Sequence, residues 1–249
     1  MTSTYGSYVA IGDSFTEGVG DELPDGRVRG WADFVAAGLA ASSDDTVLYA
    51  NLAIRGRLLG PIVGTQLEPA LALGPELLSI NGGGNDVMRP KVSIEGVADR
   101  IAAAVDRATS TGTRVLFVSG ANPTRHLPLG NAIEKRGNLL ADAVEKRFET
   151  RDVTHVNNWV DTELSDSRYW SRDKLHLNPL GHARVAANVL AALGLPAVED
   201  PEAPDIPKQP TAAYYREYVL PWIGRRLTGR SSGDNREPKI PTLQPVPQP

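Results

Sequence analysis

The sequence YVAIGDSFTEGVGD, residues 8–21, decides the fold of this 249-residue chain. Its first four residues are apolar, and Val9 and Ile11 are β-branched, as is typical of a buried strand. The apolar run then ends in Gly-Asp-Ser, so Ser14 stands at the tip of the predicted strand. In open parallel sheets, ligands bind outside such carboxyl ends. The stretch therefore predicts a functional site at the end of the first strand.

Four further short apolar runs are predicted to be strands: residues 46–54, 76–83, 114–120 and 154–159. Helical patterns separate them, most clearly at residues 31–42, 94–112, 131–148 and 178–194. In the last of these, Asn178 is a plausible N-cap and Pro179 takes the first helical position. Alternating strands and helices predict an α/β fold whose parallel sheet of five strands is covered by helices on both faces.

The composition of the chain changes after the last helical pattern. Residues 1–196 are expected to form one α/β domain, followed by a proline-rich linker at 197–213. Residues 214–229 predict an amphipathic C-terminal helix, and residues 230–249 are expected to form a disordered tail. The preferred interpretation of the helix is a strap that docks on the domain. A lid, a dimer contact that mediates self-association and a membrane-surface element are the alternatives.

Charge and cysteine content exclude several classes of function. The net charge of −4 does not provide the basic surface that nucleic-acid binding requires. Without cysteine, the chain has no disulfides, thiolate metal sites or cysteine nucleophiles. No segment approaches the ~18 consecutive apolar residues of a membrane span. Because the first residues also lack a basic, signal-like region, we expect a cytoplasmic protein with no stable membrane insertion.

A serine, a glycine and an asparagine follow three of the predicted strands. Ser14 ends the first, Gly56 follows the second, and Asn85 follows the third. A serine nucleophile needs a base and a set of donors for the oxyanion that forms when it attacks a carbonyl group. A glycine allows a backbone N–H to approach the reacting carbonyl, and an asparagine amide is a further donor.

Of the four histidines, His176 is the best candidate for the base. It lies in a polar loop before the last helical pattern, three residues after Asp173, whose carboxylate could orient the imidazole. His182 falls on the following helix, His126 lies in a loop on the same sheet edge, and His155 lies inside a predicted strand. His126 is a candidate for the substrate pocket, whereas a structural role is expected for His155.

Four blocks resemble, in order and spacing, those of the SGNH hydrolases, also called the GDSL family. They are GDSFTEG (12–18), the second block with Gly56, GGND (83–86) and DKLHLNPLGH (173–182), and the resemblance spans about residues 6–194. It implies a flavodoxin-like, three-layer α/β/α sandwich with a five-stranded parallel sheet. It also implies that Ser14 is the nucleophile, His176 the base and Asp173 its partner. Ser14 N–H, Gly56 N–H and the Asn85 side chain would then form the oxyanion hole.

The chain departs from the family pattern in three places. Pro179 follows His176 only after two other residues, Phe15 stands where the family often has leucine, and Gly60 is a rival to Gly56. None of these departures removes a functional group, so we keep the assignment and favour Gly56, which lies nearer the strand tip.

The resemblance predicts a serine esterase that acts through an acyl-enzyme on small-molecule esters, with small or short-chain acyl groups and with no cofactor or metal. A thioesterase, lysophospholipase or acyltransferase could use the same residues. A non-catalytic protein that binds an acylated ligand is the alternative from another class.

Overall fold

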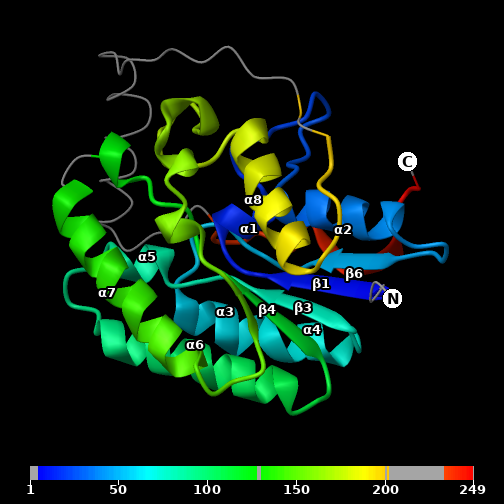
Figure 1. Cartoon of the computed structure of the whole chain (residues 1–249), viewed down its shortest axis with the longest axis horizontal. Coiled ribbons are helices and arrows are strands. Elements are labelled where there is room, and N and C mark those ends of the chain that lie inside the picture. Colours follow the sequence, from blue (N-terminus) through cyan, green and yellow to red (C-terminus); the bar gives the residue numbers. More distant parts are fainter. Residues whose placement is uncertain (1–4, 128–129, 200, 202–232, 249) are drawn as a thin grey trace.

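The structure, a computed structural model, describes residues 5–127, 130–199, 201 and 233–248. Within these ranges a six-stranded sheet with the order β5-β4-β3-β1-β2-β6 forms the centre of the fold (Figure 1). The strands are β1 (Ser7–Ile11), β2 (Leu48–Asn51), β3 (Leu77–Ile80), β4 (Arg114–Val118), β5 (Thr154–Val156) and β6 (Ile240–Pro245). β1 to β5 run parallel, whereas β6 pairs antiparallel with β2. The predicted parallel sheet is confirmed, and a sixth strand extends it.

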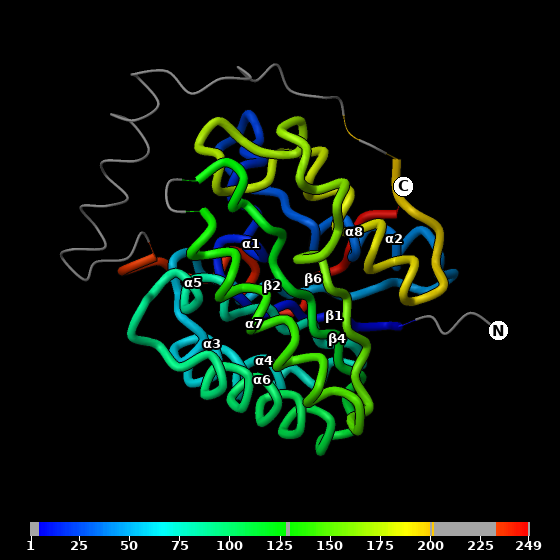
Figure 2. The backbone as a smooth tube through the Cα atoms, turned by 60° about the vertical axis from the view of Figure 1, so that its left-hand side comes forward, coloured from blue at the N-terminus to red at the C-terminus, as the bar shows by residue number. Residues whose placement is uncertain are grey.

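Helices cover both faces of the sheet (Figures 1 and 2). They are α1 (Ser14–Glu17), α2 (Trp31–Ala41), α3 (Leu59–Thr65), α4 (Leu67–Ala72), α5 (Gly84–Val87), α6 (Ile94–Thr109), α7 (Gly130–Phe148) and α8 (Pro179–Ala192). Short 3-10 turns occupy Thr124–His126, Asn158–Val160, Glu163–Ser165 and Ser167–Tyr169. α2 and α8 pack on one face, and α3, α4, α6 and α7 pack on the other. The predicted α/β/α sandwich is therefore the observed architecture.

The side chains of β1 explain why its sequence is continuously apolar. Tyr8 and Ala10 contribute to the core under α2 and α8, whereas Val9 and Ile11 contribute to the core on the opposite face. All four are fully buried. A central parallel strand has no solvent-facing side, so alternation of polar and apolar residues is absent.

The C-terminal residues 230–249 contain a strand, which corrects the expectation of a disordered tail for residues 240–245. Leu48 pairs with Pro245 and Asn51 with Ile240, and Val246 N–H donates to Val47 O at 2.9 Å. Prolines are tolerated here because β6 is an edge strand, where one row of N–H groups needs no partner. The predicted helix at 214–229 and all of the predicted linker except 197–199 and 201 lie outside the described residues.

The short helix α1 begins immediately after β1 and carries Ser14 as its first residue. Asp13 caps the helix by accepting a hydrogen bond from Phe15 N–H at 3.0 Å. Gly18 ends the helix with φ of +102°, and a Cβ atom there would lie 2.6 Å from the Gly30 nitrogen. The strand therefore turns sharply into the helix and leaves Ser14 at the sheet edge.

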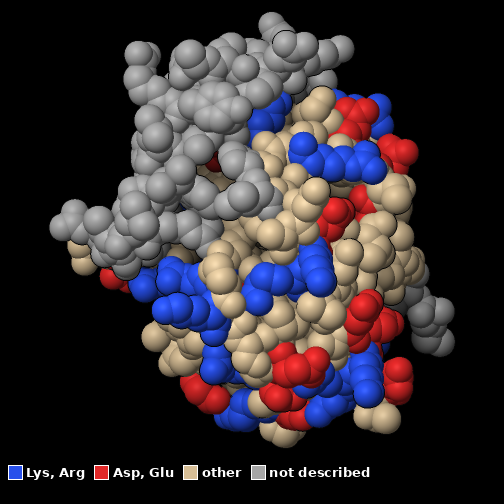
Figure 3. All heavy atoms as spheres, turned by 90° about the vertical axis from the view of Figure 1, so that its left-hand side faces the viewer, with Lys and Arg blue, Asp and Glu red and all other residues tan. Residues whose placement is uncertain are grey.

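Both signs of charge are interspersed over the face of the molecule shown in Figure 3. Arg147 on α7 pairs with Glu95 and Asp99 on α6, and these acidic partners are largely exposed. Exposed ion pairs of this kind add little stability. Among the described residues, no helix has both the length and the apolar composition needed to cross a membrane.

Candidate active site

Ser14, His176 and Asp173 form a continuous chain of hydrogen bonds. Ser14 Oγ lies 3.0 Å from His176 Nε2, and His176 Nδ1 lies 2.5 Å from Asp173 Oδ2. Ser14 is the first residue of α1, shortly after β1, whereas the other two residues come from the loop before α8. The structure therefore brings Ser14 together with two residues that lie about 160 positions later in the sequence.

The loop that carries Asp173 and His176 is organised by the carboxylate itself. Asp173 Oδ1 accepts hydrogen bonds from Ser171 Oγ at 2.7 Å and from the N–H groups of Leu175 and His176, each at 2.9 Å. Ser171 N–H donates to His176 O at 2.8 Å and closes the turn. The loop then leads into α8, where Asn178 is the N-cap, as predicted. The imidazole is thus held by a locally ordered turn.

The electrostatic attraction between His176 and Asp173 sets the protonation state of each group. Burial alone would lower the pKa of His176 and raise that of Asp173. The attraction between the two groups outweighs burial, so the pKa of His176 is raised and the pKa of Asp173 is strongly lowered. When the histidine is neutral, Nδ1–H donates to Asp173 and Nε2 is free to accept the proton of Ser14.

A second carboxylate, Asp13, lies next to Ser14 and is only 6% exposed. Its Oδ2 accepts a hydrogen bond from Asn85 Nδ2 at 3.0 Å, and the same Nδ2 donates to Arg57 O at 3.0 Å. Burial raises the pKa of Asp13 to about 6. Asn85 is therefore anchored beside Ser14, with both of its N–H groups engaged.

Gly56 lies in the loop between β2 and α3 with φ of +73°, a conformation that favours glycine. Ile54 N–H donates to Gly12 O at 3.2 Å, which aligns the start of this loop with the end of β1. Gly60, its rival in the sequence, lies in the first turn of α3. Ser14, Asn85 and His176 line the pocket described below, whereas Gly56 is not among its lining residues.

The other histidines have different surroundings. His182 is fully buried: its Nδ1 accepts from Trp31 N–H at 3.3 Å and its Nε2 donates to Val19 O at 3.2 Å. Burial lowers its pKa to about 3, so the ring is neutral. His126 packs its ring on Trp170. His155 is paired with Glu145 at 2.8 Å, yet it also lines the pocket, which the sequence did not indicate.

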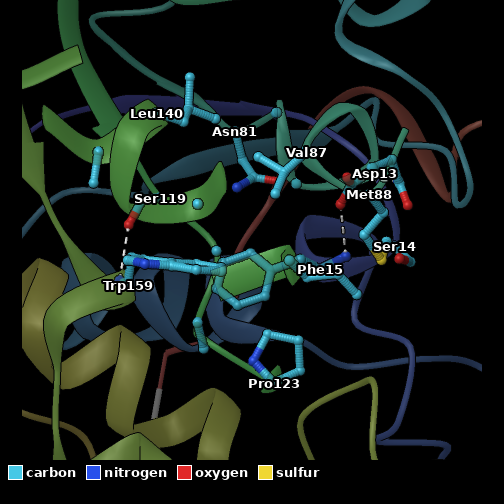
Figure 4. A pocket seen from close by; sticks show the side chains of 18 of the residues that line it. Asp13, Ser14, Phe15, Asn81, Val87, Met88, Ser119, Pro123, Leu140 and Trp159 are labelled. Atoms are coloured by element: carbon cyan, nitrogen blue, oxygen red, sulfur yellow. Dashed lines mark hydrogen bonds between the residues drawn. The ribbon is translucent and has the colours of Figure 1, made fainter. Parts of the chain in front are cut away.

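A pocket of about 140 Å³ opens beside Ser14 and His176. Figure 4 shows Asp13, Ser14, Phe15 and Met88 around one part of it and Ser119, Leu140 and Trp159 around another. Its walls are mainly apolar and come from the sheet edge, α5, α7 and the loops after β4 and β5: Phe15, Val87, Met88, Phe117, Ile133, Leu140, Val144, Trp159, Trp170, Leu175 and Leu177. The α7 side chains could have been found from the apolar stripe of its helical pattern.

Asn81 adds a polar feature to this pocket. It is 3% exposed and donates through Nδ2 to Val118 O at 2.8 Å. Its Oδ1 has no hydrogen-bond partner among the described residues. A buried acceptor without a partner is costly, so the pocket favours an occupant or a water molecule that offers a donor there.

The model of the GDSL-like Lipase/Acylhydrolase family matches residues 10–184, and the chain belongs to this family. The matched range contains Ser14, Gly56, Asn85, Asp173 and His176. Membership supports ester hydrolysis as the general activity of the chain.

One relative and two solved structures are similar to most of the chain. The chain is 24% identical to the uncharacterized protein YpmR of Bacillus subtilis over 75% of this chain and 82% of the relative. Its fold is similar to that of TesA, with a TM-score of 0.60 and 21% identity over 75% of this chain and 97% of the other. It is also similar to Axe2, an acetylxylan esterase from Geobacillus stearothermophilus, with a TM-score of 0.59 and 19% identity over 78% and 97% of the two chains.

Proposed function

We propose that this protein is a serine carboxylic ester hydrolase that acts through an acyl-enzyme. Ser14 is the nucleophile, His176 the general base and Asp173 the group that orients and stabilises the imidazole. The observation that carries the proposal is the hydrogen-bonded chain in which 3.0 Å separates Ser14 Oγ from His176 Nε2 and 2.5 Å separates His176 Nδ1 from Asp173 Oδ2.

The chemistry follows from these contacts. Ser14 Oγ attacks the ester carbonyl while its proton passes to His176 Nε2, and the resulting imidazolium is stabilised by Asp173. As the tetrahedral intermediate collapses, the C–O bond to the alcohol breaks and His176 gives its proton to the leaving oxygen. A water molecule then loses a proton to His176 and attacks the acyl carbon. The bond from that carbon to Ser14 Oγ breaks, His176 returns the proton to Oγ, and the acid is released.

The oxyanion is held by the N–H groups of Ser14 and Gly56 and by the Asn85 side chain. Neither backbone N–H group has a hydrogen-bond partner within the described part of the chain, so both can donate to substrate. The Asn85 N–H group that donates to the Arg57 carbonyl oxygen would donate to the oxyanion instead when substrate is bound. The exchange is favourable because a charged oxygen accepts a stronger hydrogen bond than a neutral carbonyl.

The acyl group occupies the apolar pocket, which supports a longer chain than the short one expected from the sequence. The pocket reaches from Ser14, after β1, to His155 on β5, three strand spacings away. Neighbouring strands lie about 4.8 Å apart, so this span is about 14 Å. An extended hydrocarbon advances about 1.3 Å per carbon because each C–C bond of about 1.5 Å is inclined to the chain axis. About 14 Å corresponds to about eleven carbons at this spacing, so the pocket suits acyl chains of up to about ten carbons.

A series of p-nitrophenyl esters from acetyl to palmitoyl, assayed with wild type and Ser14→Ala, tests both parts of the proposal. We expect kcat/KM to peak at octanoyl or decanoyl, and Ser14→Ala to lose activity and labelling by a fluorophosphonate. Wild-type protein that stays folded but is neither active nor labelled would contradict the enzyme and favour a binding protein. Acyl thioesters, and alcohols added as acceptors, test the thioesterase and acyltransferase alternatives with the same residues.

A variant at the far end of the pocket separates acyl length from the chemistry. Val144 is 2% exposed on α7 and lines the pocket, whereas Leu139 on the same helix is 51% exposed. Val144→Trp should lower activity on decanoyl esters far more than on acetyl esters, and Leu139→Trp should change neither. Equal loss on all acyl chains would show that the pocket does not hold the acyl group. In a second series of acetate esters with alcohols of increasing length, a loss for Val144→Trp that grows with the alcohol would assign the pocket to the leaving group.

A further inference from the structure

The C-terminal segment reaches the interior beside the helix that carries Ser14, although it lies beyond the residues that match the family. Lys239 directly precedes β6, and its side chain is only 16% exposed. Its Nζ donates to Glu17 O at 2.7 Å, to Val28 O at 3.1 Å and to Asp33 Oδ2 at 2.5 Å. All three N–H groups of the ammonium are thus satisfied by three different segments.

The contact with Glu17 O stabilises the carboxyl end of α1. Glu17 is the last residue of this four-residue helix, and Ser14 is the first. A helix this short has almost no internal hydrogen bonds to fix it, so its position depends on external partners. A cation that donates to the last carbonyl groups of a helix is a favourable partner. Lys239 therefore holds the helix of Ser14 from its far end.

The side chain of the same Glu17 holds the loop that contains Gly56. It is 8% exposed, and its carboxylate accepts hydrogen bonds from Arg55 N–H at 2.6 Å and from Arg55 Nε at 2.8 Å and Nη2 at 2.5 Å. A charge-assisted contact to both the backbone and the guanidinium fixes the residue immediately before Gly56. Glu17 thus links α1, which carries Ser14, to the loop that follows β2.

The C-terminal segment also lies directly on this loop. A Cβ atom on Gly233 would lie 2.0 Å from Arg55 O, so the two backbones are in close contact. Arg236 Nη1 lies 3.9 Å from Glu17 Oε1. Gly233, Arg236 and Lys239 therefore all converge on the Glu17–Arg55 pair, and the pairing of β6 with β2 anchors them.

We propose that Lys239 and Glu17 are positioning residues of the esterase site. By holding α1 against the Gly56 loop, they set the spacing between the Ser14 and Gly56 N–H groups, so that both donate to one oxyanion. The C-terminal segment is then an integral part of the site rather than an appendage. This inference rests on the proposed function, because it needs an oxyanion at Ser14.

Lys239→Met is the first test, because methionine keeps most of the side-chain length but donates no hydrogen bond. A displacement of about 1 Å at a reacting centre can cost about a hundredfold, so we expect kcat to fall about ten- to a hundredfold. KM should change little, because neither residue lines the acyl pocket. Lys239→Arg, which restores a cation and donors, should recover part of kcat. Fluorophosphonate labelling should slow in parallel with kcat, since it uses the same donors.

Two matched controls separate positioning from stability. Leu243→Ala removes an apolar contact of β6 with the core while leaving Lys239 in place, and Lys91→Met removes an exposed lysine. At a temperature well below every melting point, both controls should keep wild-type kcat. If Lys239→Met also kept it, or if kcat followed the melting temperature in all variants, the inference would be overturned.

Glu17→Gln gives an independent test that leaves the backbone carbonyl in place. Loss of the charge weakens the Arg55 contact, so kcat should again fall with little change in KM. The double variant Lys239→Met/Glu17→Gln should lose less than the product of the two single losses, because both act on one link. Fully multiplicative losses would contradict a shared role. Failure of the proposed function would look different, because wild type itself would then be inactive.

Discussion

Asp173 holds His176 at two points: its Oδ2 lies 2.5 Å from the imidazole Nδ1, and its Oδ1 accepts the His176 backbone N–H at 2.9 Å. One carboxylate therefore fixes both the ring and the chain that bears it. The imidazole consequently has little freedom to rotate away from Ser14 Oγ, its second partner at 3.0 Å.

Asp173→Asn should lower kcat by about a thousand- to ten-thousandfold. The amide presents an N–H group to Nδ1, which favours the tautomer whose Nε2 carries the hydrogen and cannot accept the Ser14 proton. Ester hydrolysis at a pH near 8 measures the loss, with the exposed Asp142→Asn on α7 as the control. Activity within about tenfold of wild type would contradict the assigned role of Asp173.

On the acid side of the pH profile, kcat/KM should begin to fall at a pH above the ordinary histidine pKa of about 6.5. This fall is the acidic limb of the profile. His176 must be neutral to act as a base, so activity is lost as pH falls through its raised pKa. The negative charge of Asp13 contributes to that rise, so Asp13→Asn should move the limb to lower pH. The kcat/KM profile of both proteins measures the shift. Asp25→Asn at an exposed site is the control, and an unmoved or upward-shifted limb would contradict the argument.

Stability should depend on pH through His182, whose pKa is lowered to about 3 by burial. The unfolded chain takes up the proton near pH 6.5, so the contribution of this residue is complete above about 6.5 and is lost as pH falls towards 3. The full loss is about 5 kcal/mol, at 1.36 kcal/mol per pKa unit. The raised pKa of Asp13 acts in the opposite direction between about 4 and 6.

Urea unfolding of wild type and His182→Gln across this range isolates the histidine, because Asp13 is common to both. The variant should be less stable near neutral pH, since it loses the packing of the ring, but its stability should fall less on acidification. Parallel pH curves for the two proteins would rule out this assignment of the pH dependence.

Gly137→Ala should destabilise the protein, although alanine favours a helix over glycine by about 1 kcal/mol. A Cβ at this position of α7 would lie 1.9 Å from Cζ2 of Trp159. The indole would have to move and would lose its hydrogen bond from Nε1 to Asn138 Oδ1, now 2.7 Å. Gly64→Ala, on a helix with nothing within 4 Å, is the matched control and should raise the melting temperature. A rise in both variants would contradict this packing.

Most of the sheet and the central residues of the site could be predicted from local patterns. β1, β3 and β4 are short, mainly apolar runs, and Ser14 follows the point where the first of them stops. Asp173 and His176 are three residues apart before an evident N-cap, so their proximity needs no knowledge of the rest of the fold. The meeting of this loop with Ser14 follows from the shared carboxyl edge of the parallel strands.

The C-terminal strand and the pocket could not be predicted in this way. Pro241 and Pro245 give β6 the composition of a disordered tail, and its partner strand lies almost 200 residues earlier. The burial of Lys239 depends on that distant pairing. The size of the pocket depends on how closely α7 approaches the loops after β4 and β5, which the contact between Gly137 and Trp159 helps to set. No local pattern encodes these contacts.

The covering of β2 by β6 bears on how copies of this protein behave in concentrated solution. An uncovered β2 would offer a row of free N–H and C=O groups to another chain, and such edges promote aggregation. β6 replaces it with an edge in which Pro241 and Pro245 have no N–H to donate. Removal of the last strand should therefore produce insoluble protein even where the remaining sheet can still fold.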